Sequence, residues 1–245
     1  MSDINNKVFA SFDKFKLSLI DEYLDGPRDL EVGMNLINTL FEENNYQLVK
    51  LMLDREGVHL NQEIIVKCLD SFDLGLYQLL YPQHLKLSYD LMNGACSSGN
   101  VELVKWLKEK NCPWNDRASH YAAQNGHLEV LMWLRANGCP WNSLTFTYAA
   151  GYGDLKVLQW LKVNGCPWNE TAFLYAACRG HFNVLQWLRL NGCPWNKSTF
   201  ACAAGYGDLN ILKWLKNKGC SWDCETFTKA ALSGNLDVLK WLKDS

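Results

Sequence analysis

Residues 139–165 read CPWNSLTFTYAAGYGDLKVLQWLKVNG, and residues 166–192 read CPWNETAFLYAACRGHFNVLQWLRLNG. The two blocks have the same length. Both open on Cys-Pro-Trp-Asn and both carry Val-Leu-Gln-Trp-Leu near their end. A sequence that repeats itself at a fixed period of about 20 to 50 residues indicates a solenoid, a propeller or an array of stacked units.

Tryptophan shows how far the repeat extends. All eleven tryptophans of the chain fall into two series, and in each series the step is 27 residues. The first series is Trp106, Trp133, Trp160, Trp187, Trp214 and Trp241, and the second is Trp114, Trp141, Trp168, Trp195 and Trp222. We expect both series to be buried between repeats, because burying one tryptophan removes about 150–250 Å² from water. A ligand-stacking role for these rings is the alternative.

The first half of a unit predicts a short helix from about Leu144 to Tyr152. Asn142 or Ser143 precedes it and offers a side-chain oxygen to the free N–H groups of the first turn. Gly153 follows and ends the helix. The paired alanines inside it allow a second helix to approach closely.

The second half predicts another helix over Leu155 to Val163. Asp154 caps its start, and the apolar residues are mostly at helical spacing. Gly165 supplies the left-handed residue that ends it. The unit is therefore two short antiparallel helices, and a repeat of this length leaves no room for a strand pair.

Composition excludes several classes of function. The net charge of −2 comes without a run of Lys or Arg, so we expect no nucleic-acid binding. No apolar stretch approaches the length of about 18 residues that a membrane span needs. The polar start lacks the apolar core of a secretory signal. Ten cysteines then indicate reduced thiols and an intracellular, cytoplasmic protein, with the nucleus as an alternative.

Cysteine and histidine are the residues that suggest chemistry. One cysteine recurs at the same position of each unit: Cys112, Cys139, Cys166, Cys193 and Cys220. Equivalent atoms of stacked helices lie about 8–10 Å apart, too far for a disulfide or one shared zinc ion. His127 and His181 alternate with Asp and Asn in sister units, which favours a local hydrogen-bonding or helix-capping role over catalysis. We therefore expect no metal, no cofactor and no enzymatic activity.

Several motifs resemble the ankyrin repeat. The resemblance rests on Ala122-Ala123-Gln124-Asn125-Gly126-His127-Leu128-Glu129-Val130-Leu131, on Ala176-Ala177-Cys178-Arg179-Gly180-His181 and on Thr171-Ala172-Phe173-Leu174. It covers residues 101–245. A typical ankyrin repeat is longer, at about 33 residues, and the missing part falls where the β-hairpin finger normally lies. Such short repeats, with a Gly-Cys-Pro-Trp-Asn joint, are similar to those of giant DNA viruses, protists and algae.

The resemblance implies an all-α, ankyrin-like solenoid of stacked helix pairs without fingers. We expect a capping helix region in residues 1–31, degenerate repeats in 32–84 and six regular repeats in 85–245, all in one continuous domain. We expect a monomer.

Ankyrin proteins bind other proteins on their concave face, so the resemblance implies a protein-interaction scaffold, in a viral or protist setting that engages a cellular target. A substrate adaptor for a ubiquitin ligase is the alternative, which the lack of a Leu-Pro F-box opening weakens. The expected contact positions lie on the first helix and the loop before it, where residues vary between repeats. They are Tyr121, Gln124, Asn125, Tyr148, Tyr152, Tyr175, Arg179 and Tyr206 on the helices, with Arg117, Glu170 and Lys197 in the loops. Free drift of unconstrained residues would give the same variation.

Overall fold

The computed structural model describes residues 39–40, 49, 70–81 and 85–244. The chain divides into two compact units, residues 1–86 and 87–245. The expected capping region 1–31 and most of the degenerate repeats lie outside the described residues. The single continuous stack across both units stays a prediction.

In the first unit the structure describes one complete helix, α5 (Leu74–Leu80). The Asp73 carboxylate accepts a hydrogen bond from the Leu76 amide, 2.9 Å away, and so caps its N-terminus. Leu76, Tyr77 and Leu80 are fully buried. This cap-then-apolar pattern is the one expected for the second helix of a unit.

The second unit consists of six consecutive helix pairs, with no strand among residues 87–244. The pairs are α6 (Tyr89–Ser98) with α7 (Val101–Glu109), α8 (Asp116–Gln124) with α9 (Leu128–Ala136), α10 (Ser143–Tyr152) with α11 (Leu155–Val163), α12 (Glu170–Cys178) with α13 (Phe182–Leu190), α14 (Lys197–Tyr206) with α15 (Leu209–Asn217), and α16 (Cys224–Leu232) with α17 (Leu236–Lys243). The prediction of an all-α solenoid is confirmed.

The helix boundaries follow from local signals. The Asn142 side chain accepts from the Leu144 amide at 2.8 Å, and Asp154 accepts from the Lys156 amide at 2.8 Å. Gly153 has a φ of 94° and ends α10 in the left-handed region that glycine adopts without strain. One expectation was wrong: Arg117, Glu170 and Lys197 belong to the first helical turn, not to a loop, because the preceding Asn already caps the helix.

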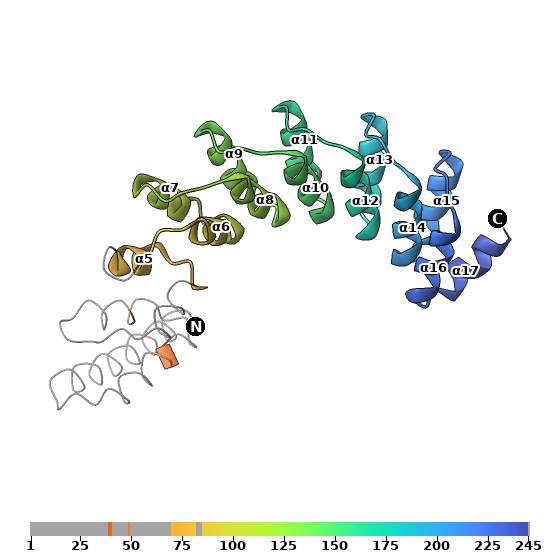
Figure 1. Cartoon of the computed structure of the whole chain (residues 1–245), viewed down its shortest axis with the longest axis horizontal. Helices are drawn as coiled ribbons and strands as arrows, with labels where there is room; N and C mark the ends of the chain where they lie inside the picture. Colours follow the sequence, from red (N-terminus) through yellow and green to blue (C-terminus); the bar gives the residue numbers. More distant parts are fainter. Residues whose placement is uncertain (1–38, 41–48, 50–69, 82–84, 245) are drawn as a thin grey trace, which may run out of the picture. The chain divides into compact units, whose positions relative to one another are not determined.

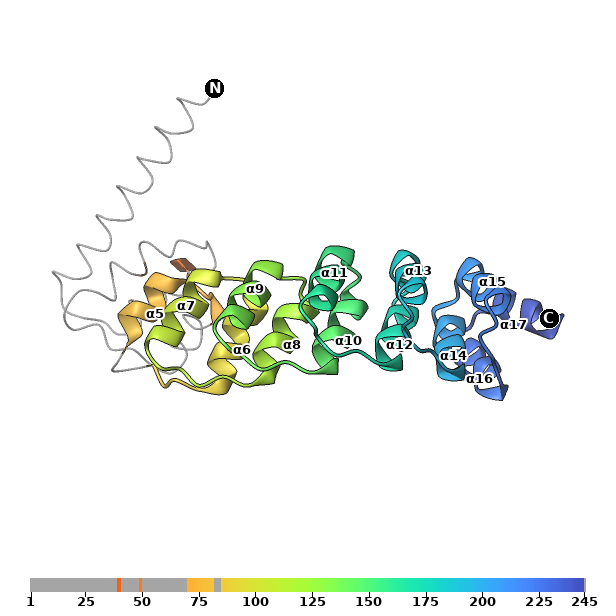
Figure 2. The ribbon, with the colours of Figure 1, turned by 90° about the horizontal axis from the view of Figure 1, so that it is seen from above.

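The first helices of the pairs line the inner side of this unit. In Figure 1, α6, α8, α10, α12, α14 and α16 follow the inner edge of an arc, and α7, α9, α11, α13 and α15 follow its outer edge. Figure 2 shows the same succession from above. The first helices pack more extensively on their neighbours than the second helices do. The unit therefore curves, and its concave surface is built from first helices.

The aromatic core of the stack is phenylalanine, not tryptophan. Phe146, Phe173 and Phe200 occupy one position of the first helix and are fully buried. The Phe146 ring meets Trp168 of the next repeat edge-on, with centroids 5.0 Å apart. The tryptophans themselves are only half-buried. Tryptophans do pack between repeats, as the contacts of Phe146 with Trp168 and Trp187 show. Only the expected complete burial was wrong, because part of each indole stays in solvent.

Cationic side chains cover the tryptophans of the joints. The Arg135 guanidinium lies 4.2 Å from the centroid of Trp141, and the Lys108 ammonium lies 3.8 Å from that of Trp114. A cation over an indole face is attracted by the ring quadrupole. Each of these cations lies in the last turn of the second helix of one repeat, and each ring lies near the start of the next repeat. The pairs thus join successive repeats along the outer surface.

The joint cysteines are buried hydrogen-bond donors. The Cys139 thiol lies 3.5 Å from the carbonyl oxygen of Asn115, and the other four repeat this contact with the equivalent carbonyl of the preceding repeat. Burial raises the pKa of Cys139 to about 11. These contacts support a structural role for the five joint cysteines. Within the described part of the chain, no group of three His, Cys, Asp or Glu residues is placed to hold a metal ion.

Two buried threonines on α10 provide a stability test. The Thr145 hydroxyl has no hydrogen-bond partner among the described residues, whereas Thr147 bonds to the Ser143 carbonyl at 3.0 Å and to Thr171 at 2.6 Å. A buried unsatisfied polar group costs about 1–3 kcal/mol. We expect Thr145→Val to raise the free energy of unfolding by about 1 kcal/mol and Thr147→Val to lower it by a similar amount. Urea denaturation checks both, and the same sign of change in the two variants would contradict the assignment.

Candidate partner-binding surface

A row of tyrosines lies on the inner face of α8, α10 and α12. Tyr121, Tyr148 and Tyr175 occupy the same position of three successive first helices. The Tyr148 and Tyr175 rings meet edge-to-face, with centroids 6.0 Å apart and planes at 88°. Tyr121 and Tyr175 are each 40% exposed. The contact between rings holds the aromatic surface in place while leaving much of it accessible.

Two hollows adjoin along this row. The first has a volume of about 400 Å³ and the second about 480 Å³, and both are lined by Gln124 and Tyr148. The first is also lined by Asn125, Gly151, Tyr152, Tyr175, Arg179 and His181, and the second by Asp116, Arg117, His120, Tyr121 and Leu144. Eight of the eleven residues expected at the contact surface therefore lie around the two hollows.

Polar contacts fix the walls of the second hollow. The Asn142 amide donates to the Asp116 carboxylate at 2.7 Å, and its oxygen lies 2.9 Å from Nε2 of the buried His120. The contact requires the Nε2-protonated tautomer, since the amide oxygen accepts. The network connects α8 to the start of α10. It sets the spacing between two neighbouring walls of the surface.

The first hollow is framed in a similar way. The Asn125 amide donates to the Ser97 hydroxyl at 3.0 Å and to the Tyr121 carbonyl at 2.9 Å. Nε2 of His181 lies 2.9 Å from the Gly151 carbonyl of the preceding repeat, and donates to it. These bonds hold the asparagine and histidine side chains, so the tyrosine rings and the Arg179 guanidinium are the exposed groups.

Of the two roles expected for His127 and His181, helix capping was wrong, whereas hydrogen bonding is found, to a neighbouring repeat. Neither makes a side-chain hydrogen bond to its own helix start. Each reaches back to a carbonyl of the preceding repeat, Ser97 for His127 and Gly151 for His181. Asn235, at the same position, also leaves its helix uncapped and donates to the Gly205 carbonyl of the preceding repeat. Histidine and asparagine carry an N–H that can donate to a carbonyl, whereas the Asp154 carboxylate can only accept and therefore caps its own helix.

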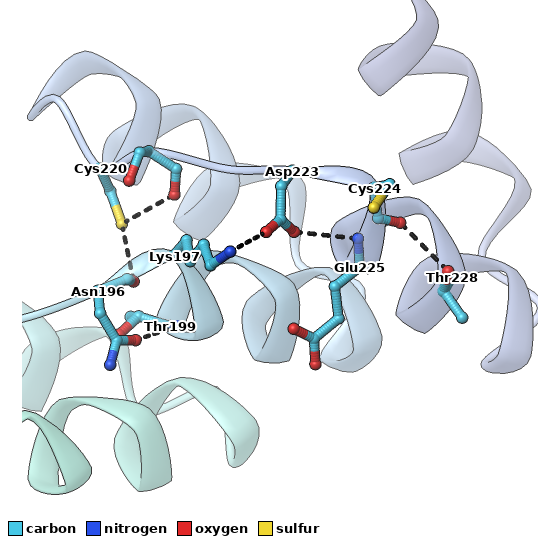
Figure 3. Close-up of polar contacts among 9 residues, drawn as sticks. Asn196, Lys197, Thr199, Cys220, Asp223, Cys224, Glu225 and Thr228 are labelled. Atoms are coloured by element: carbon cyan, nitrogen blue, oxygen red, sulfur yellow. Dashed lines mark hydrogen bonds and ion pairs between the residues drawn. The ribbon is translucent and has the colours of Figure 1, made fainter.

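Three expected contact residues lie outside the hollows: Tyr206, Glu170 and Lys197. Lys197 pairs with Asp223 of the next repeat, with Nζ and Oδ2 2.8 Å apart (Figure 3). This hydrogen-bonded ion pair lowers the pKa of Asp223 and raises that of Lys197. Asp223 also caps α16 through the Glu225 amide. The Lys197 ammonium thus supports the joint between repeats.

A two-repeat alternation was missed in the sequence. The ring of Tyr152 lies on Gly126 of the preceding repeat, and that of Tyr206 lies on Gly180. In the intervening repeats His127 and His181 cover Gly99 and Gly153 instead. The signal was present as Gly-Tyr-Gly-Asp in every second repeat, alternating with Gly-His. Tyr152 is therefore part of a joint as well as part of the surface.

Two glycines test this packing. Gly126 and Gly138 both have positive φ, 73° and 80°, but only at Gly126 would an added Cβ overlap the Tyr152 ring; at Gly138 it meets open space. Left-handed backbone costs alanine about 1–2 kcal/mol. We expect Gly138→Ala to lower stability by that amount and Gly126→Ala to lower it by about 1 kcal/mol more. Equal urea midpoints for the two variants would show that the Tyr152 ring is not packed there.

Comparisons with known proteins agree with this geometry. A family model of ankyrin repeats in three copies matches residues 146–226, and a second, of many copies, matches 94–135 and 119–161. Together they span residues 94–226, more than half of the chain. The chain belongs to the ankyrin repeat family.

Solved structures show the same fold. The human ASB11 ankyrin repeat domain superposes with a TM-score of 0.50 and 20% identity, over 62% of this chain and 82% of that one. No curated protein sequence matches the chain significantly. Ankyrin repeats generally mediate contacts between proteins and are typically not enzymes. Among the described residues, each ankyrin helix is too short or too polar to cross a membrane.

Proposed function

We propose that this ankyrin repeat protein is a scaffold that binds a partner protein on the concave face of α8, α10 and α12. The observation that carries the proposal is the pair of adjoining hollows lined by Tyr121, Tyr148 and Tyr175. Tyrosine offers a large contact area with few rotors and a polar tip, so it contributes to binding at a small entropic cost. Tyr and Arg are also enriched among the residues that dominate interface energies.

Preorganisation supports the proposal. The edge-to-face contact of Tyr148 with Tyr175 and the hydrogen bonds of Asn125 and His181 already fix the walls in the free protein. A surface that is ordered before binding loses little entropy when a partner docks. The exposed Arg179 guanidinium at the edge of the first hollow favours a carboxylate on the partner, through charge-assisted hydrogen bonds.

The proposal is tested with a photo-crosslinking residue at Gln124, which lines both hollows. A matched variant carries the same residue at Lys156, exposed on α11. In cell extract we expect one partner to be linked from position 124 and not from position 156. Excess unlabelled wild-type protein should compete for that partner, and a Tyr148→Ala, Tyr175→Ala variant should not. Equal linking from both positions, or full competition by the variant, would contradict the proposal.

A further inference from the structure

Two cysteines on the inner face differ from the buried cysteines of the joints. Cys178 ends α12 and is exposed, and Cys202 lies on α14 and is partly exposed. The two helices are neighbouring first helices of the stack. The equivalent pairs of the adjoining repeats, in the same register, are Gly151 with Tyr175 and Gly205 with Lys229. The cysteines therefore face each other across one joint of the stack.

The sister pairs give the spacing of this register. A Cβ built on Gly151 would lie 3.6 Å from Cβ of Tyr175, and a Cβ built on Gly205 would lie 3.6 Å from Cβ of Lys229. Cys178 and Cys202 occupy the joint between these two, that of α12 with α14. Disulfide-bonded cysteines have Cβ atoms about 3.5–4.5 Å apart. The repeat geometry thus places the two Cβ atoms at the separation that a disulfide needs.

The electrostatic surroundings activate one of the thiols. A hydrogen bond from the Cys202 thiol lowers the pKa of Cys178 to about 7, and the charges of Lys229 and Arg179 also act to lower it. The same contact raises the pKa of Cys202. In the joints, by contrast, burial raises the pKa of Cys166 and Cys193 to about 12. At neutral pH a large fraction of Cys178 is the thiolate, which is the nucleophilic form.

We propose that Cys178 and Cys202 are a redox-active pair that closes to a reversible disulfide between α12 and α14. With hydrogen peroxide as oxidant, the Cys178 thiolate attacks one peroxide oxygen, the O–O bond breaks, and the released hydroxide takes a proton to become water. Cys178 is then a sulfenic acid. The Cys202 sulfur attacks the Cys178 sulfur, the S–O bond breaks, and a second water leaves with the proton of Cys202. Two thiols and one peroxide give one disulfide and two waters.

The disulfide would join two repeats at the edge of the tyrosine surface. Cys178 directly precedes Arg179, which lines the first hollow. The cross-link would tie the end of α12 to α14 and restrain the position of that guanidinium. The inference does not depend on the proposed function, because the thiol chemistry is measured on the isolated protein.

Mass spectrometry on the whole chain tests the pair directly. The reduced protein is treated with one equivalent of hydrogen peroxide, the remaining thiols are alkylated, and the protein is digested with trypsin without reductant. We expect residues 163–179 and 198–213 to be recovered as one linked species, which a reductant separates. Fragmentation should place the bond at Cys178, with Cys166 of the same peptide alkylated after unfolding. Absence of the linked species, or a bond at Cys166, would overturn the proposal.

Reactivity provides the second measurement. At pH 7 a thiol with a pKa near 7 is about half ionised, against about 3% for an ordinary thiol, and lower nucleophilicity offsets part of this gain. We expect Cys178 to be alkylated about threefold faster than the exposed Cys224, with an apparent pKa near 7 that is lost in Cys202→Ser. Cys224→Ser is the matched control and should leave the linked species unchanged. An unchanged Cys178 rate in Cys202→Ser, with a native circular dichroism spectrum, would contradict the pairing.

Discussion

Phe146→Ala is expected to lower the free energy of unfolding by about 3–5 kcal/mol, the usual range for a large aromatic removed from a core. The Phe146 side chain is fully buried. It meets Trp168 edge-on and stacks on Trp187 at a centroid distance of 6.5 Å, so both contacts cross to the next repeat. Alanine leaves a cavity between two repeats that the rigid helix pairs cannot close.

Trp160→Ala is the matched comparison. Trp160 is partly exposed, and its ring centroid lies 5.8 Å from that of Trp141 in its own repeat. We therefore expect a smaller loss for this variant, about 1–3 kcal/mol. Urea denaturation is followed by circular dichroism and by fluorescence, because loosely coupled repeats do not always unfold in one step. A larger loss for Trp160→Ala than for Phe146→Ala would place the tryptophans, rather than the phenylalanines, in the core.

The features of the fold that the sequence predicts correctly are local ones. The 27-residue period gives the number of repeats. Asn142 and Asp154 cap helices, and Gly153 ends one, each within a few residues of its own position. The helix bounds therefore follow closely from the sequence, except that the first turn holding Arg117, Glu170 and Lys197 was assigned to a loop. The burial of a side chain does not follow from the sequence in this way, because the repeat step is the same for a ring inside the stack and for one at its outer edge. Only the register between repeats shows that Phe146 is fully buried while Trp160 is partly exposed.

The same limit applies to the candidate surface. Position in the repeat correctly placed Tyr121, Tyr148 and Tyr175 on one face, since equivalent residues of stacked helices align. Position in the repeat could not show that Lys197 forms an ion pair with Asp223. That pair depends on Asp replacing Asn at position 223, one repeat later. Contacts between neighbouring repeats, such as that of His181 with the Gly151 carbonyl, have no signature within a single repeat.

Tyr148→Ala combined with Tyr175→Ala is expected to weaken partner binding by about 2 kcal/mol or more, roughly 30-fold in Kd. These two rings touch each other at the inner face, and the first hollow is lined by both. A partner that fills this hollow loses both aromatic contacts at once. Tyr152 is left intact, because its ring packs on Gly126 and its removal would disturb the joint between repeats.

This loss is measured by isothermal titration calorimetry with the partner that is crosslinked from position 124. A double variant on the outer side, Lys156→Ala with Lys213→Ala, changes two exposed side chains of α11 and α15 and should bind like wild type. Tyr148→Phe with Tyr175→Phe keeps the rings and removes only the hydroxyls, so it separates aromatic contact from hydrogen bonding. We expect this third variant to retain most of the affinity, because the rings supply the buried area. Unchanged affinity in the alanine variant, with a native urea midpoint, would remove the tyrosine row from the binding site, because the fold would be intact and the contacts gone.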